Sequence, residues 1–366
     1  MKKKILLILN TYDFMSAGLR RNSSIEKKYK IFNKLDKSWA NFFYNNLKKD
    51  YKLKKIYPFL DKKFLRDEQI LRKMGHDLKF NPNYIFNTTN NSNIHSYIKK
   101  FKNTKKMIWL SHNVSESDLR YLKSVYDCLI TYNDNLITTA RKINFKYYKL
   151  MISSPKVFKT NFKNFKKRSN KIYFTGSLGN NFTARLRYLI FLYENFDLKL
   201  RLRNTIEKYK INNLLNSILI KIFPKIIDHL YNKKVLPFTN KLKYVNENEI
   251  FGKELIKELQ KFKFCININS DFDKDKNINS RVFEALSCGC LLFTDKNKCM
   301  ESVFKNEKHV IYFKSKEDLK NKINYYKKNI KKAFKISQRG NSIFNKKYHS
   351  KARLKEFKKI LIKEGI

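Results

Sequence analysis

Short apolar runs alternate along the chain with segments whose apolar residues recur at helical spacing. Runs of strand length lie at Ile5–Leu9, Lys106–Leu110 and Cys128–Tyr132, and a helical segment carrying Leu119 and Leu122 lies between the last two. Continuous apolar runs of this length are typical of strands buried on both faces of a parallel sheet. Strands that alternate with helices of about ten residues therefore predict βαβ units and an open parallel sheet in the N-terminal half.

The alternation fades in a Lys- and Asn-rich stretch at residues 155–170 and resumes at Lys171. We therefore expect an α/β protein of two tandem Rossmann-like domains, an N-terminal domain over residues 1–160 and a C-terminal domain over residues 161–349. Residues 350–366 are expected to form a helix that packs back on the N-terminal domain. Expected elements of the second domain are strands at Ile172–Phe174, Phe262–Ile268, Cys290–Thr294 and His309–Phe313, and helices at Phe182–Tyr193, Arg281–Ser287 and Leu319–Ile330.

The composition adds a strong positive charge to this picture. The chain of 366 residues holds 81 Lys and Arg against 31 Asp and Glu, a net charge of +50. Its hydrophobic content of 42% excludes disorder for most of the chain. Such a charge suggests nucleic acid, an anionic membrane or an acidic ligand as partner. Abundant Lys, Asn, Ile, Phe and Tyr are also what the codon bias of an A/T-rich genome produces, so both interpretations stay open.

The five cysteines are odd in number and lie mostly in apolar runs, which favours buried thiols in a reducing compartment. Cys288 and Cys290 have no second Cys/His pair at zinc spacing, so we expect no metal site. The apolar run near Met1 is too short for a signal peptide, and no run approaches the ~18 residues that span a bilayer. We expect a cytoplasmic protein, at most peripheral on the inner face of the membrane.

In open parallel sheets, ligands bind beyond the carboxyl ends of the strands. The segment Thr175–Gly179 leads from an expected strand into a helix, so backbone N–H groups at Gly176 and Ser177 can hold a phosphate. Arg185 and Arg187 follow in the first turns of that helix, where a cation opposes the helix dipole unless an anion lies nearby. The pattern indicates a diphosphate site, although two solvated arginines in a basic chain would look the same.

A second expected loop leads into the helix that begins near Ser280. With Ser280 as N-cap, Glu284 lies one position beyond the capping-box position, so its carboxylate is not committed to the cap. A carboxylate near a helix N-terminus at this edge can accept hydrogen bonds from both hydroxyls of a ribose. Spacing alone is equally compatible with an ordinary surface glutamate.

The run Asn279–Leu292, with Lys308–Phe313 downstream, resembles the C-terminal domain of the CgeB-like glycosyltransferases. The resemblance extends over Phe262–Phe357 and includes Gly340. These are GT-B enzymes, with two Rossmann-like domains facing across a cleft, which transfer a sugar from a nucleotide donor without a catalytic metal. The resemblance implies that Glu284 holds the donor ribose and that Arg281 and the Gly176 loop lie near the donor phosphates. It implies no cofactor beyond the nucleoside diphosphate sugar as co-substrate.

One position departs from the related larger group of GT-B enzymes, which carries another Glu eight residues before the ribose-binding one. Here that position is Lys276, so the contacts to the donor sugar stay open. Inverting transfer needs a base for the acceptor hydroxyl. The candidates are His112, after a strand of the N-terminal domain, and Asp13, after the first strand. His76, His95 and His229 look like ordinary surface or boundary histidines.

The sequence thus predicts a metal-independent glycosyltransferase of hexosyltransferase type. We expect it to use a nucleoside diphosphate sugar and a cell-surface glycan or lipid-linked acceptor, with an anionic membrane surface as a further partner. Two alternatives are a basic nucleic-acid-binding protein and a GT-B scaffold that has lost catalysis. No nucleic-acid-binding motif supports the first, and the presence of Arg281 and Glu284 argues against the second.

Overall fold

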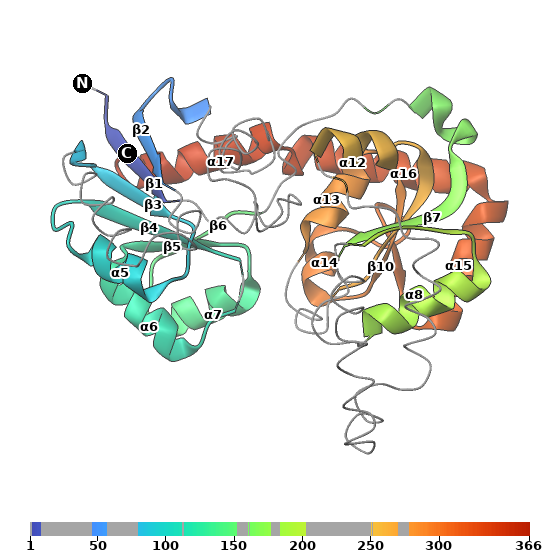
Figure 1. Ribbon diagram of the computed structural model, residues 1–366, viewed down its shortest axis with the longest axis horizontal. Helices are drawn as coiled ribbons and strands as arrows, with labels where there is room; N and C mark the ends of the chain where they lie inside the picture. The colour runs from blue at the N-terminus through green and yellow to red at the C-terminus, as the bar shows by residue number, and fades with distance from the viewer. Residues whose placement is uncertain are drawn as a thin grey trace, which may run out of the picture. The chain divides into compact units, whose positions relative to one another are not determined.

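The computed structural model describes residues 2–8, 46–56, 80–111, 113–151, 160, 162–176, 184–202, 250, 252–269 and 278–366. The chain divides into two compact units. Unit 1 comprises Met1–Val157, Lys276–Ile278 and Asn345–Ile366, and unit 2 comprises Phe158–Asp275 and Asn279–Phe344. In Figure 1 the strands of unit 1 run from blue to green, and those of unit 2 from green to orange.

Unit 1 is built on a parallel sheet with the strand order β2-β1-β3-β4-β5-β6. Its central strands are almost entirely buried, as expected for a sheet covered on both faces. Figure 1 shows α5, α6 and α7 together along one side of this sheet. The elements are β1 (Lys4–Ile8), β2 (Lys52–Ile56), β3 (Tyr84–Asn87), α5 (Ser92–Lys99), β4 (Lys105–Leu110), α6 (Glu116–Val125), β5 (Cys128–Thr131), α7 (Asp134–Lys142) and β6 (Tyr147–Lys149).

Unit 2 has a second parallel sheet, with the order β11-β10-β9-β7-β8. Its strands are β7 (Ser169–Gly176), β8 (Leu198–Leu202), β9 (Phe262–Asn267), β10 (Leu291–Asp295) and β11 (Ile311–Phe313). Its helices are η2 (Phe162–Lys167), α8 (Ala184–Asn195), α12 (Gly252–Leu259), α13 (Ser280–Ser287), α14 (Lys298–Val303), α15 (Lys316–Lys328) and α16 (Ile330–Ile343). Two parallel sheets with helices confirm the predicted α/β class.

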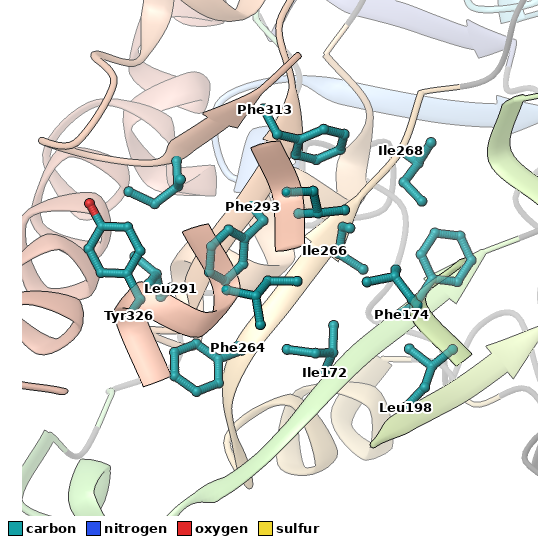
Figure 2. Close-up of a cluster of buried hydrophobic side chains, with 14 of the residues drawn as sticks. Ile172, Phe174, Leu198, Phe264, Ile266, Ile268, Leu291, Phe293, Phe313 and Tyr326 are labelled. Carbon is teal, nitrogen blue, oxygen red and sulfur yellow. The ribbon is translucent and has the colours of Figure 1, made fainter. Parts of the chain in front are cut away.

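The core of unit 2 explains why this sheet is stable. Phe264, Phe293 and Phe313 come from three neighbouring strands and are at most 1% exposed (Figure 2). The ring centroids of Phe264 and Phe293 are 6.1 Å apart, and Tyr326 of α15 packs edge-on to Phe293. Each fully buried aromatic or aliphatic side chain contributes about 1.5–3 kcal/mol. This core holds the strand ends on which the candidate site is built.

The last helix, α17 (Ser350–Lys363), follows the short η4 segment (Phe344–Tyr348) and belongs to unit 1. The Phe357 ring lies 5.0 Å from that of Phe86 on β3. Beyond the helix, the fully buried carboxylate of Glu364 pairs with Lys105 at 2.9 Å and Lys146 at 2.6 Å. The last residues are therefore bound to the amino ends of unit 1 strands, at the opposite edge from the strands' carboxyl ends.

The structure divides one predicted helix into two. The apolar spacing predicted a single helix over Leu319–Ile330, but α15 ends at Lys328 and α16 begins at Ile330. Asn329 lies between them with φ −104° and ψ 56°, and its side chain donates to the Tyr325 carbonyl. Asn readily bonds to nearby backbone in this way, which competes with helix continuation.

His95 is a second correction, because the sequence suggested an ordinary surface or boundary histidine and the structure buries it. Its Nδ1 lies 2.7 Å from the hydroxyl of Tyr126, and its Nε2 accepts the Asn91 N–H at 3.1 Å. The side chain is 2% exposed, and burial lowers the pKa of His95 to about 4. Hydrogen bonding to Tyr126 and Asn91 makes it part of the interior of unit 1. Within the described ranges, no helix has the length and apolarity to cross a bilayer.

Candidate functional site

The candidate site lies at the carboxyl ends of β7, β9 and β10. These strands are neighbours and parallel, so their carboxyl ends lie at one edge of the unit 2 sheet. Gly176 ends β7, Asn269 follows β9, and Asp295 ends β10. The helix α13 follows β9 in the chain and starts at this edge. Ligands of open parallel sheets bind at such an edge.

The N-cap of α13 is Asn279, not Ser280 as predicted. The Oδ1 of Asn279 accepts the Arg281 N–H at 3.1 Å, while Ser280 is the first helical residue and is exposed. Both residue types cap helices well. Asn279 also donates from Nδ2 to Oδ1 of Asn267, at 2.6 Å. Asn279 thus caps the helix through Oδ1 and bonds to Asn267 and Asn269 through Nδ2, and the helix begins one residue earlier than predicted.

The C-terminal end of α13 is held as firmly as its start. Nη1 of Arg168, a buried cation, donates to the carbonyls of Cys288 and Gly289 at 3.0 and 3.1 Å, where the helix dipole favours positive charge. Nδ2 of Asn341 donates to the carbonyls of Leu286 and Ser287. Gly289 adopts φ +66°, and a Cβ there would lie 2.7 Å from Phe162 and Thr160. The side chains on α13 therefore project from a fixed helix.

Arg281 and Glu284 form an ion pair on the first turns of α13. Nη1 of Arg281 lies 2.6 Å from Oε2 of Glu284, and their side chains are 26% and 18% exposed. Among the described residues, Oε1 of Glu284 has no recorded hydrogen bond. The carboxylate is therefore not committed to the cap, as predicted, but it is bound by the neighbouring arginine. The pair presents one carboxylate oxygen and a half-buried guanidinium at the ligand edge.

Arg185, on the first turn of α8, reaches the end of the neighbouring strand. Its Nε donates to the Ile268 carbonyl at 2.9 Å. Asp295, whose Oδ1 accepts the Asn269 N–H at 3.0 Å, lies close enough for Arg185 to act on it. Burial raises the pKa of Asp295, and the charge of Arg185 opposes that rise. A protein carboxylate is therefore near this cation, where the sequence suggested either a ligand diphosphate or a solvated arginine. Arg187 is exposed.

The structure brings four of the predicted residues to one edge and leaves the others undescribed. Gly176, Arg185, Arg281 and Glu284 all lie at or beside the carboxyl ends of the unit 2 strands. Ser177, His112, Asp13 and Lys276 lie outside the described residues. In the part of the chain that is described, no three His, Cys, Asp or Glu side chains gather as a metal site would require. Metal independence stays a prediction.

Sequence reasoning missed a network of amides at the same edge. Asn267, Asn269, Asn279 and Thr294 are joined by hydrogen bonds, and we call them the amide network. Asn is abundant throughout this chain, so no single Asn stood out. A usable signal was the alternation Asn267-Ile268-Asn269 directly after the apolar run Phe264–Ile266, where polar side chains are expected only if they are paired.

Comparison with protein-family models matches residues 221–359 to the glycosyl transferase-like family. The matched segment contains β9, α13 and β10, and so most of the edge described above. Comparison with curated proteins finds no match.

Solved structures resemble this chain over almost its whole length. A glycosyltransferase from Rickettsia africae is 13% identical with a TM-score of 0.55, covering 98% of this chain and 97% of the other. Anabaena HepE in complex with UDP and glucose is 12% identical with a TM-score of 0.61, covering 99% and 100%. Sucrose-phosphate synthase from Thermosynechococcus elongatus is 11% identical with a TM-score of 0.64, covering 99% of each. The fold is therefore that of the GT-B glycosyltransferases, with two parallel-sheet Rossmann-like domains.

Proposed function

We propose that this protein is a GT-B glycosyltransferase that transfers a hexose-type unit from a nucleoside diphosphate sugar. The observation that carries the proposal is the Arg281–Glu284 pair on a helix fixed at both ends, at the ligand-binding edge of unit 2. The family match over residues 221–359 supports the reaction class. Anabaena HepE, which shares the fold, binds UDP and UDP-glucose, and this supports a UDP-linked donor.

In this proposal Glu284 accepts hydrogen bonds from the donor ribose. Its Oε2 is held by Arg281, so Oε1 remains as an acceptor whose position is fixed by the ion pair. A charge-assisted hydrogen bond of this kind contributes about 1.5–3 kcal/mol. Because the side chain is already ordered, little rotamer entropy is lost on binding.

The diphosphate is assigned to the positive groups at the same edge. Arg281 carries guanidinium N–H donors besides the one bound to Glu284, and the segment that begins at Gly176 leads into α8. Guanidinium groups and backbone N–H groups before a helix suit phosphate oxygens. Their role is to hold the leaving diphosphate while the sugar is transferred. A general base for the acceptor, His112 or Asp13, remains a hypothesis.

The acceptor is proposed to be a cell-surface glycan or a lipid-linked precursor, reached by a cytoplasmic enzyme bound peripherally to the membrane. The net charge of +50 supports an anionic surface as partner, because each basic residue near such a surface contributes up to about 1 kcal/mol. The resemblance to CgeB-like enzymes supports a transfer that needs no catalytic metal.

A thermal-shift screen with UDP-, GDP-, dTDP- and CMP-sugars tests the proposed function. A ligand that binds only the folded state raises the free energy of unfolding, by about 2.7 kcal/mol when its concentration is about a hundred times Kd. The melting temperature rises accordingly. We expect one nucleotide class to raise it and the others not. If none of the four classes raises the melting temperature, and no tritiated sugar is released from labelled nucleotide sugars, the protein is not a nucleotide-sugar enzyme.

A further inference from the structure

The amide network ends in a hydrogen-bond donor that has no partner among the described residues. Nδ2 of Asn267 donates to Oγ1 of Thr294 at 3.0 Å and to Oδ1 of Asn269 at 3.3 Å. Nδ2 of Asn279 donates to Oδ1 of Asn267 at 2.6 Å and to Oδ1 of Asn269 at 3.2 Å. Nδ2 of Asn269 is buried and makes no hydrogen bond within the described ranges. Asn269 is 3% exposed, so bulk water does not replace the missing partner.

The orientation of the Asn269 amide follows from the backbone. The N–H of Arg281 can only donate, so the atom of Asn279 that meets it must be Oδ1, which directs Nδ2 of Asn279 to the other two asparagines. Oδ1 of Asn269 therefore faces two donors. Rotating this amide would set N–H groups against N–H groups, and so its Nδ2 is fixed on the side away from them.

The main chain around Asn269 is fixed as well. Its N–H donates to Oδ1 of Asp295 at 3.0 Å, and the preceding carbonyl of Ile268 accepts from Arg185 at 2.9 Å. Backbone and side chain are thus held by residues of β9, β10, α8 and the start of α13. A donor held on so many sides at a ligand-binding edge is preorganised for an acceptor that the described part of the chain does not supply.

We propose that Nδ2 of Asn269 donates a hydrogen bond to an oxygen of the sugar carried by the nucleotide donor. This inference rests on the proposed function and adds a sugar-recognising residue to it. A neutral amide beside the Asp295 carboxylate suits a hydroxyl, which can accept from Nδ2 and donate to a carboxylate oxygen. A phosphate oxygen is disfavoured at this point because the carboxylate repels it. Asn269 therefore distinguishes sugar-linked nucleotides from the free nucleoside diphosphate.

The test compares the Kd of UDP with that of UDP-glucose, and the Kd of GDP with that of GDP-mannose, by calorimetric titration. Asn269→Asp keeps an oxygen that accepts from Asn267 and Asn279 but removes the Nδ2 donor, and Asn269→Ala removes the whole amide. We expect Asn269→Ala to bind the free diphosphate within about twofold of wild type. The added charge of Asn269→Asp weakens both ligands, so the ratio of the two Kd values is the readout for that variant. Relative to the free diphosphate, the sugar nucleotide should bind about three- to tenfold more weakly in both variants, the loss of one neutral hydrogen bond.

Asn341→Ala is the matched control, because Asn341 is a buried amide of the same unit whose Nδ2 is bound to backbone carbonyls. It should lower the melting temperature without changing the ratio of the two Kd values. An unchanged ratio in both Asn269 variants would overturn the inference, and so would equal weakening of both ligands. If Asn269→Ala does not fold, Asn269→Asp decides alone. Wild type that binds none of the four nucleotide classes of the thermal-shift screen would instead refute the proposed function, and the inference with it.

Discussion

Nη1 of Arg281 lies 2.6 Å from Oε2 of Glu284, three residues apart on the first turns of α13. Sequence considerations treated these side chains separately, one for the ribose and one for the phosphates. In the structure each fixes the other, because a carboxylate that is 18% exposed is costly without a paired cation. The two proposed contacts to the donor should therefore depend on each other.

Replacing Arg281 should weaken nucleotide binding. Arg281→Ala removes the phosphate contact and leaves Glu284 unpaired, so we expect nucleotide affinity to fall about ten- to a hundredfold. A double-mutant cycle with Glu284→Gln, measured by calorimetry, should give a coupling energy of about 0.5–3 kcal/mol.

Lys322→Ala is the control for that experiment. Lys322 forms a similar ion pair with Asp318 at 2.9 Å on α15. Its removal should leave nucleotide affinity unchanged. If Arg281→Ala behaves like Lys322→Ala, or if the Arg281 and Glu284 effects are additive, the pair does not act as one binding unit.

The proposed reaction should not need a divalent metal. We expect release or transfer of the sugar to continue at a rate within about twofold after dialysis against EDTA, because Arg281 and backbone N–H groups are assigned the charge of the leaving diphosphate. Activity is measured before and after dialysis and after adding back Mn²⁺ or Mg²⁺. Loss in EDTA with recovery in Mn²⁺ would refute this expectation.

Glu364 should make stability depend on acid pH. Burial raises its pKa, but hydrogen bonds from Lys146, Tyr148 and Lys105 outweigh burial and lower the pKa of Glu364 to about 2. The unfolded carboxyl titrates near its ordinary value of 4.5. The stabilisation is therefore complete above about pH 4.5 and is lost as pH falls toward 2.

Melting curves of wild type and Glu364→Gln at pH 7, 5 and 3 measure this effect. The wild type should melt higher at pH 7 and 5, and the difference should shrink at pH 3. Glu116→Gln is the control, because Glu116 pairs with Lys142 and Arg120 on the surface, where such pairs contribute little. A difference that stays constant from pH 7 to pH 3 would show that the Glu364 charge does not stabilise unit 1.

The basic surface should bind anionic membranes in a salt-dependent way. With a net charge of +50, we expect sedimentation with phosphatidylserine vesicles at low salt, and release as added salt shortens the Debye length from about 30 Å at 0.01 M to about 8 Å at 0.15 M. Vesicles of phosphatidylcholine are the control. Failure to bind either kind of vesicle at low salt would contradict a membrane role for the basic surface and favour codon bias as the origin of the charge.

Periodicity predicted most central strands and the edge strand β11, and it missed the central strand β3 and the other three edge strands. Among the missed edge strands, β8 (LKLRL) alternates apolar with basic residues and β2 (KLKKI) mixes them, so neither contains a continuous apolar run. Edge strands carry charged residues of this kind because one side is not paired. Their pairing with β1 and β7 depends on residues distant in sequence.

The candidate site was predictable only in part, for a similar reason. The resemblance included Gly340, but only the structure shows why a glycine is needed at this position. A Cβ there would lie 2.5 Å from the carbonyl oxygen of His309. Ser280 and Asn279 are equally suitable N-cap residues as judged from residue type alone. The choice between them depends on Asn267 and Asn269, which precede the helix by about ten residues and reach it only in the folded chain.

Calorimetric titration of UDP and GDP into wild type and Glu284→Ala tests the central claim most directly. Glu194→Ala, an exposed glutamate near the end of α8, is the control. We predict that wild type binds one of these nucleotides, that Glu284→Ala binds it about ten- to a hundredfold more weakly, and that its melting temperature changes little. Equal affinity in wild type and Glu284→Ala, with Glu284→Ala melting lower, would contradict the account, because Glu284 would then serve the helix and not the ribose.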